Sequence, residues 1–275
     1  MAVPQNGYTT LATLRAAVSL ASSDTADDTK LQQAIEDASR LIDEEFGVRF
    51  YPRIATRYYT ATNPYCLMVD QLLAVTSLKT DEDGDRTYEI TWATTDYDLD
   101  PANAADENPP RPYEEIRVTP DGNYTFPRYS RGVQVIGKWG YYEVTRDSGA
   151  TASEAMDASE TGYDVSDGTL FEAGQIIKAD SEWMLITAIV TNTLTVTRGY
   201  NGSTAATHST AIALYILTFP VVATACLRLA AYLYRTKDTP FGVTGSADMG
   251  TGQIVGSFMT DLRRMLNPFR RVVVA

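Results

Sequence analysis

The feature that most constrains the fold is a run of apolar residues spaced by four, three, four and four positions: Leu31, Ile35, Ala38, Ile42 and Phe46. An α-helix brings residues three and four positions apart onto one face, so this run predicts an amphipathic helix. Gly47 follows directly and can end a helix in the left-handed conformation. A helix with one apolar face has to bury that face against another part of the chain.

Helical spacing recurs at both ends of the chain. Near the start it is carried by Leu11, Leu14 and Val18, and towards the end by two further sets: Val222, Cys226, Leu229 and Leu233, then Ile254, Phe258, Leu262 and Met265 or Leu266. Thr218 is a candidate N-cap with Pro220 in the first turn, and Asn267–Pro268 should stop the last helix. We expect these terminal helices to pack as one bundle.

Between the helices the composition is typical of β structure. Residues 53–142 are rich in Thr, Tyr, Val and Ile, which predicts antiparallel strands. Asp83–Gly84 and Asp121–Gly122 have the sequence of hairpin tips. The four prolines within residues 98–112 predict an irregular loop.

A second β-rich block follows residues 146–162, whose Ser, Thr, Ala, Gly and Glu content predicts a linker. Its expected strands are residues 175–179, 182–190, 193–197 and 211–217. The prediction is an α+β fold: a helical bundle formed by N- and C-terminal helices, an antiparallel β domain and an inserted small β module. The expected boundaries are 1–52 (N-terminal helices), 53–145 (β domain), 146–217 (inserted module with linker), 218–266 (C-terminal helices) and 267–275 (extended arm).

Composition narrows the classes of function. Hydrophobic residues make up 44% of the chain and its formal net charge is −12, which does not favour binding to phosphate backbones. The basic exception is the tail after Leu262, with four arginines and no acid. No stretch is apolar enough to predict a membrane span, and no secretory signal is expected. Cys66 and Cys226 match no metal spacing and are expected to be reduced core residues.

Candidate catalytic and metal-binding residues are few. The acidic run 81–85 lacks the glycine and glutamate spacing of an EF-hand, so it is interpreted as a solvated hairpin tip. His208 has no nucleophile motif near it and is expected in a loop. A carboxylate pair for glycoside hydrolysis is conceivable among Glu107, Glu114 and Glu115, although surface carboxylates are far commoner. We therefore expect no enzyme activity, no cofactor and no metal.

Several segments together resemble the head–tail connector (adaptor) proteins of tailed bacteriophages. The resemblance lies in the helix 26–43 with its ending Gly-Val-Arg-Phe-Tyr-Pro (47–52), in Asp-Tyr-Asp-Leu (96–99) before a Pro-rich loop, in Val-Gln-Val-Ile-Gly-Lys-Trp-Gly-Tyr (133–141), in Phe-Pro-Val-Val-Ala-Thr-Ala (219–225), and in the closing Leu-Asn-Pro-Phe-Arg-Arg (266–271). It covers about residues 8–145 and 218–271. The block between them departs from the family pattern and looks like a small β module of other phage virion proteins.

The resemblance implies a structural role in the virion neck, after assembly in the host cytoplasm. Subunits of such proteins form a ring, usually twelve-fold, beneath the portal protein, and a stopper or tail-completion protein attaches to the far side. Genomic DNA passes through the ring without specific binding, and no membrane is involved. Two alternatives remain open: another neck or tail-completion protein such as a stopper, and a virion carbohydrate-binding or decoration protein.

The C-terminal segment is the predicted portal-docking arm. Because Pro268 stops the last helix, the chain beyond it should leave the bundle. The arm comprises Pro268, Phe269, Arg270, Arg271, Val272, Val273 and Val274. Its valines suit a strand added to a sheet edge of the portal, and its arginines suit carboxylates there. The alternative is a strand that folds back onto the chain's own β domain.

Overall fold

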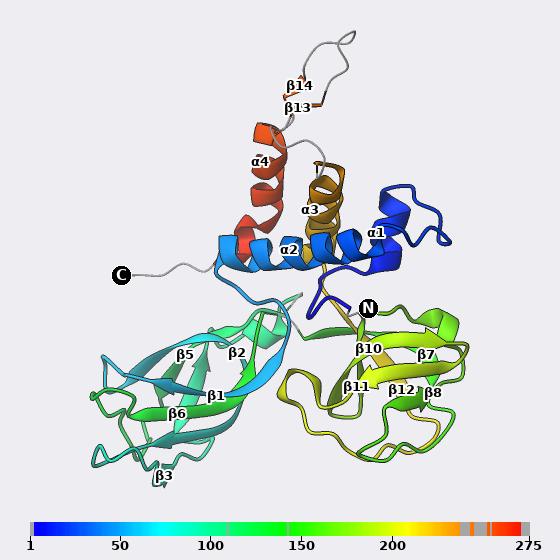
Figure 1. Cartoon of the computed structure of the whole chain (residues 1–275). Helices are drawn as coiled ribbons and strands as arrows, with labels where there is room; N and C mark the ends of the chain where they lie inside the picture. Colours follow the sequence, from blue (N-terminus) through cyan, green and yellow to red (C-terminus); the bar gives the residue numbers. More distant parts are fainter. Residues whose placement is uncertain are drawn as a thin grey trace. The chain divides into compact units, whose positions relative to one another are not determined.

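The structure is a computed structural model that describes residues 3–108, 110–141, 143–236, 243–244, 252–253 and 255–270. It has an α+β fold, as predicted (Figure 1). Its helices are α1 (Leu11–Ala17), α2 (Asp28–Phe46), α3 (Val222–Thr236) and α4 (Val255–Leu266). Two six-stranded sheets hold nearly all of the described strands, and a short pair, β13 (Val243–Thr244) with β14 (Gly252–Gln253), precedes α4.

Helix α2 follows the predicted pattern. Its buried face includes Leu31, Ile35, Ala38, Ile42 and Phe46. Gly47 ends the helix at φ 64°, and its N–H donates to the carbonyl of Asp43. Helix α1 is capped by Thr10, whose side chain accepts the Thr13 N–H.

The predicted bundle from opposite ends of the chain is confirmed by direct contacts between α2 and α3. The Ser39 Oγ and Cys226 Sγ atoms lie 3.4 Å apart in the buried interface. At one end of the pair, the Tyr234 hydroxyl donates to an Asp27 carboxylate oxygen at 2.6 Å. The predicted N-cap of α3 is wrong: Thr218 ends a strand, and the helix begins at Val222.

The first sheet has the strand order β1-β6-β2-β5-β4, with β3 paired to β2. Its core includes Trp92 stacked on Phe126, with ring centroids 4.7 Å apart, and the fully buried Trp139. The strands are β1 (Arg53–Tyr59), β2 (Cys66–Thr80), β3 (Ile90–Thr91), β4 (Tyr97–Asp100), β5 (Tyr113–Val118) and β6 (Val133–Trp139).

The loops of this sheet were predicted with mixed success. Asp83–Gly84 lies between the paired strands β2 and β3, which confirms that hairpin. The hairpin at Asp121–Gly122 is wrong, because β5 and β6 each pair with β2 and not with one another. The irregular loop begins later than predicted, since residues 98–100 belong to β4 and pair with β5.

The second sheet has the strand order β7-β12-β9-β10-β11-β8. The four predicted strands are found with small shifts at their ends. The predicted linker is wrong, because residues 144–151 form the edge strand β7 and the backbone N–H of Ala152 donates to Ile212 at 3.0 Å. The strands are β7 (Val144–Thr151), β8 (Gly162–Asp164), β9 (Ile176–Ala179), β10 (Glu182–Val190), β11 (Thr193–Thr197) and β12 (Ala213–Thr218).

The chain divides into two compact units. One joins the helices with the second sheet, and comprises residues 1–48, 145–200 and 204–275. The other holds the first sheet, and comprises residues 49–144 and 201–203. Within the described residues, no helix combines the length and apolar character that crossing a bilayer would require.

Candidate functional site

The most elaborate polar cluster of the described chain is buried at one end of the second sheet. Glu182, which begins β10, is fully buried and accepts both Nε and Nη2 of Arg198, at 2.8 and 2.9 Å. The N–H groups of Gly199 and Ala206 donate to the same carboxylate at 2.8 and 3.0 Å. His208 places Nε2 at 2.9 Å from Glu182 and Nδ1 at 2.9 Å from Asp180.

These contacts decide the charge state of Glu182. Burial by itself would raise the pKa of this carboxyl, but the hydrogen bonds from Arg198, Gly199, Ala206 and His208 outweigh burial and lower the pKa to about 2. The pKa of Arg198 is raised, chiefly by its hydrogen bond to Glu182. Glu182 and Arg198 therefore form an ionised pair although they are shielded from water, and hydrogen bonds satisfy the carboxylate.

Arg198 also ties the cluster to two loops. Its Nη1 donates to the carbonyls of Asp157 and Glu160, at 2.6 and 2.8 Å, and its Nη2 donates to the carbonyl of Ala206 at 2.6 Å. A planar guanidinium with five donors can satisfy this many acceptors at once. The cluster holds the irregular segments of the second sheet in place.

His208 lies in the loop before β12, as predicted, and it is buried there. The residue forms a backbone bridge with Met156, and its side chain is fully buried. Its partners lie 26 and 28 residues away in the sequence, so no local sequence motif predicts the cluster. Arg198 and Glu182 were likewise missed, because each stood alone among strand and loop residues.

The acidic hairpin between β2 and β3 brings four carboxylates together. Those of Asp81, Asp83, Asp85 and Glu89 offer oxygens within 4.8 Å of one another. Asp81 is buried and accepts the N–H groups of Gly84 and Arg86, at 2.7 and 3.0 Å. Burial would raise the pKa of Asp81, but these hydrogen bonds and one from Tyr129 lower it. The chain's own N–H groups therefore close this loop around Asp81 without requiring a cation.

Two of the candidate glycosidase carboxylates, Glu114 and Glu115, do not face one another. Glu114 and Glu115 are consecutive in β5 and so point to opposite faces of the first sheet. Glu115 pairs with Arg117 at 2.7 Å and accepts the Cys66 thiol at 2.6 Å. Glu107 pairs with Arg111 at 2.7 Å. Cys66 is thus half-buried rather than in the core, whereas Cys226 is buried as predicted.

The predicted docking arm is described only in its first part. Asn267–Phe269 form a 3-10 turn directly after α4, and the backbone turns extended at Arg270, with φ −65° and ψ 127°. Arg271, Val272, Val273 and Val274 lie outside the described residues. Leu262 and Leu266 are buried, which anchors the end of α4.

Basic side chains surround this end of α4. Arg263 pairs with Glu45 of α2 at 2.9 Å. The side chain of Arg264 is 80% exposed, and Arg270 is exposed as well. The described part of the C-terminal segment is therefore a basic surface at the end of a packed helix.

Comparisons with known proteins find similarity among solved structures. No protein-family model matches the chain, and no curated protein matches it significantly. Among solved structures it is similar to a chain in the neck of an empty GTA particle computed with C6 symmetry. The TM-score is 0.44 and the sequence identity 13%, over 100% of this chain and 95% of that chain.

Proposed function

We propose that the protein is a structural head–tail connector (adaptor) of a tailed phage. In this role its subunits form a ring, twelve-fold as in the family it resembles, under the portal protein. DNA passes through the ring, and a stopper or tail-completion protein attaches to it. The role is assembly and requires no catalysis. The protein would then reside in the virion neck.

The observation that carries this proposal is the packing of the two chain ends. The segments that resemble connector proteins include α2 and α3, which lie almost 200 residues apart in sequence yet share a buried contact between Ser39 and Cys226. A connector needs one rigid body that keeps its docking segment in place while neighbours bind around it. Packing of helices from both ends supplies such a body.

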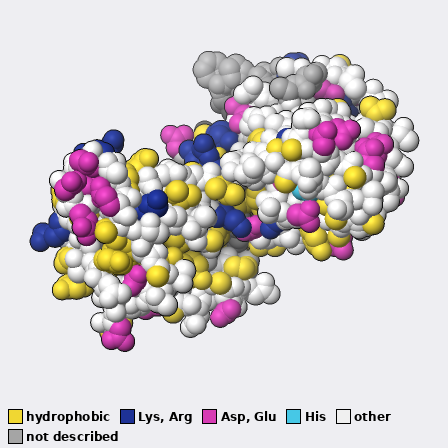
Figure 2. All heavy atoms as spheres, turned by 90° about the horizontal axis from the view of Figure 1, so that it is seen from below, with side chains coloured by type: hydrophobic (Ala, Val, Ile, Leu, Met, Phe, Trp, Pro, Cys, Tyr) yellow, Lys and Arg dark blue, Asp and Glu magenta, His cyan; other side chains and the backbone are white. Residues whose placement is uncertain are grey.

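The distribution of charge supports passage of DNA without retention. Acidic and basic side chains are interspersed on the described face in Figure 2, and no broad basic patch lies there. With a net charge of −12, the chain as a whole repels phosphates. A ring of such subunits would let a duplex slide, since tight binding of DNA depends on many Lys and Arg contacts to phosphate.

The exposed arginines near the end of α4 support portal docking. Arg264 and Arg270 are exposed, and Arg can bind carboxylates in a bidentate way. In the proposal these residues and the arm that follows bind the outer edge of the portal. Arg263 is engaged with Glu45 and keeps α4 against α2.

Electron microscopy of the protein mixed with its portal tests the proposal. We expect a closed ring of this protein on one face of the portal, and in virions a ring between portal and tail. A ring that binds the tail but not the portal would identify a stopper instead. Localisation on the capsid shell or on host glycans would contradict the connector role and favour a decoration protein.

A further inference from the structure

A cavity of about 400 Å³ opens within the unit that joins the helices and the second sheet. Its lining comes from residues 7–13 before and at the start of α1, from β7, from the loop before β9 and the start of that strand, from the end of β12, and from the first half of α3. Its size is that of pockets that hold small molecules or peptide side chains. None of the clusters described above contributes to it.

One part of the lining is apolar and firm. Ile176, Leu217 and Phe219 line the cavity and are each at least 93% buried. Tyr8 meets Phe219 edge to face, with ring centroids 4.8 Å apart. The Tyr8 hydroxyl is held in turn by Asp43 of α2. This wall can cover an apolar side chain without rearranging.

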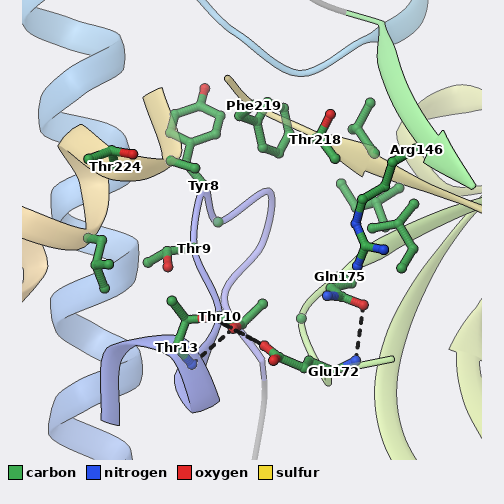
Figure 3. A pocket seen from close by; sticks show the side chains of 17 residues that line it. Tyr8, Thr9, Thr10, Thr13, Arg146, Glu172, Gln175, Thr218, Phe219 and Thr224 are labelled. Atoms are coloured by element: carbon green, nitrogen blue, oxygen red, sulfur yellow. Dashed lines mark hydrogen bonds between the residues drawn. The ribbon is translucent and has the colours of Figure 1, made fainter. Parts of the chain in front are cut away.

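Two side-chain acceptors of the lining are already engaged. The Glu172 carboxylate accepts the hydroxyls of Thr10 and Thr13 and is turned towards them (Figure 3). The Gln175 side-chain oxygen accepts the Glu172 backbone N–H at 3.0 Å. Because this bond fixes the amide orientation, the Gln175 side-chain NH₂ faces away from Glu172.

The guanidinium of the exposed Arg146 and the Gln175 side-chain NH₂ are among the lining donors that have no acceptor among the described residues. Arg146 projects from β7 across the cavity towards Gln175 in Figure 3. A guanidinium beside an amide NH₂ offers several N–H groups at one place and no acceptor. Such a site is complementary to a carboxylate, which is acceptor-only when ionised.

We propose that this cavity binds an extended acidic peptide segment of a neighbouring protein. Its carboxylate accepts hydrogen bonds from Arg146 and Gln175, and an adjacent apolar side chain covers Ile176 and Leu217. A free inorganic anion would accept hydrogen bonds from Arg146 and Gln175 but would not pack against the apolar wall. The proposal goes beyond the connector role and does not depend on it, because the residues that line the cavity do not belong to α4 or to the arm.

NMR of the ¹⁵N-labelled full chain tests this with defined probes. The first probe is the capped dipeptide acetyl-Leu-Glu-amide, and its neutral counterpart is acetyl-Leu-Gln-amide. We expect the acidic probe to shift the Gln175 side-chain NH₂ resonance and the backbone resonances of Ile176 and Leu217. The neutral probe should bind at least about tenfold more weakly, since it cannot form the charge-assisted pair.

Variants complete the test. Arg146→Gln should weaken the acidic probe by about tenfold and leave the neutral probe unaffected. Arg128→Gln, which removes an exposed arginine from the other unit, should change neither. Equal binding of both dipeptides, unchanged binding in Arg146→Gln, or shifts with inorganic phosphate alone would each overturn the proposal. So would the absence of any shift at tens of millimolar probe, whereas a missing ring on the portal would bear only on the connector role.

Discussion

At the scale of single residues, Glu182 carries the greatest structural consequence. It is the shared acceptor for Arg198, His208 and two backbone N–H groups, and no solvent reaches it. Glu182→Gln keeps the shape but turns an NH₂ towards groups that donate, and it leaves the Arg198 charge buried without its counter-ion. Breaking one partner of a buried pair costs about 3–5 kcal/mol. We expect thermal or urea unfolding to show a loss of this size.

The matched control is Glu160→Gln in the same part of the chain. The side chain of Glu160 is exposed, and only its carbonyl serves Arg198. This variant should unfold within about 0.5 kcal/mol of the wild type. If the two variants lose equal stability, the cluster is not what holds the second sheet's loops.

The low pKa of Glu182 makes a second prediction. Its folded-state pKa is about 2, below the ordinary value of 4.5, so the unfolded chain binds more protons between these values. Stability rises with pH where the unfolded state binds more protons. The contribution of Glu182 is therefore fully present above about pH 4.5 and is lost as the pH falls towards 2.

This is measured as a difference between wild type and Glu182→Gln. The gap in unfolding free energy should be constant from pH 7 to about pH 5 and should shrink below that. Other carboxyls with lowered pKa values, such as Asp157 and Asp167, titrate in both proteins and cancel. A gap that stays constant down to pH 2 would show that the Glu182 carboxylate contributes no pH-dependent stability.

Residue-scale prediction from the sequence succeeded where one local pattern carries the information. The buried face of α2 follows from spacing alone, and so does the capping role of Gly47. The cluster around Arg198 could not be predicted, because its members come from the start of β10, from the bend after β11 and from a later loop, and only tertiary packing brings them together. A polar residue that stands alone in a sequence looks the same whether it is solvated or buried in an ion pair.

At the scale of elements, β7 shows why composition misled the prediction. Small and polar residues dominate residues 146–162, which is typical of linkers. In β7, however, Ser148 and Ala150 are buried in alternation with exposed neighbours. The Ser148 hydroxyl donates to the carbonyl of Leu214 in β12 at 2.5 Å. Small side chains suffice there because the strand lies at a sheet edge against a core built by other strands.

The end of α2 supports a third prediction. Gly47 has φ 64°, and a methyl group at its position would meet nothing within 4 Å. Any cost of Gly47→Ala is therefore conformational, about 1 kcal/mol of stability. Gly47→Asn should cost less, because Asn tolerates the left-handed conformation. Chemical denaturation of both variants checks the order, and equal losses would point to a packing role instead.

At the scale of the whole molecule, the sequence predicted the components better than their grouping. The α+β class and the pairing of terminal helices follow from amphipathic patterns at both ends. The sequence predicts the second sheet as an inserted module, and in the structure this sheet and the helices belong to one compact unit. Polar contacts join them: the Asn6 N–H donates to the Tyr200 hydroxyl at 3.1 Å, and Thr10 and Thr13 donate to Glu172. Such contacts between distant segments leave no periodic signal.

The last prediction concerns the C-terminal arm, whose role in docking is part of the proposed function. Deleting residues 271–275 leaves α4 and its 3-10 turn at Asn267–Phe269 intact. The buried anchors Leu262 and Leu266 also remain. If the arm docks on the portal, its Arg271 and valines contribute to portal binding and not to the stability of the subunit. The truncated chain should therefore melt within about 2 °C of the full chain but lose portal binding.

The competing arrangement, in which the arm adds to the chain's own β domain, predicts the opposite order of effects. Removing a paired strand lowers the unfolding free energy first, and portal binding falls only as the fold is lost.

A second variant, Arg270→Glu in the full-length chain, separates charge from length: docking on portal carboxylates should weaken at least about tenfold, with the melting temperature unchanged. Pull-down on purified portal and differential scanning calorimetry, run on the same preparations, distinguish the two. Unchanged portal affinity in both variants would exclude the arm as the docking element and move the search for the portal contact to the exposed face of α4 around Arg264.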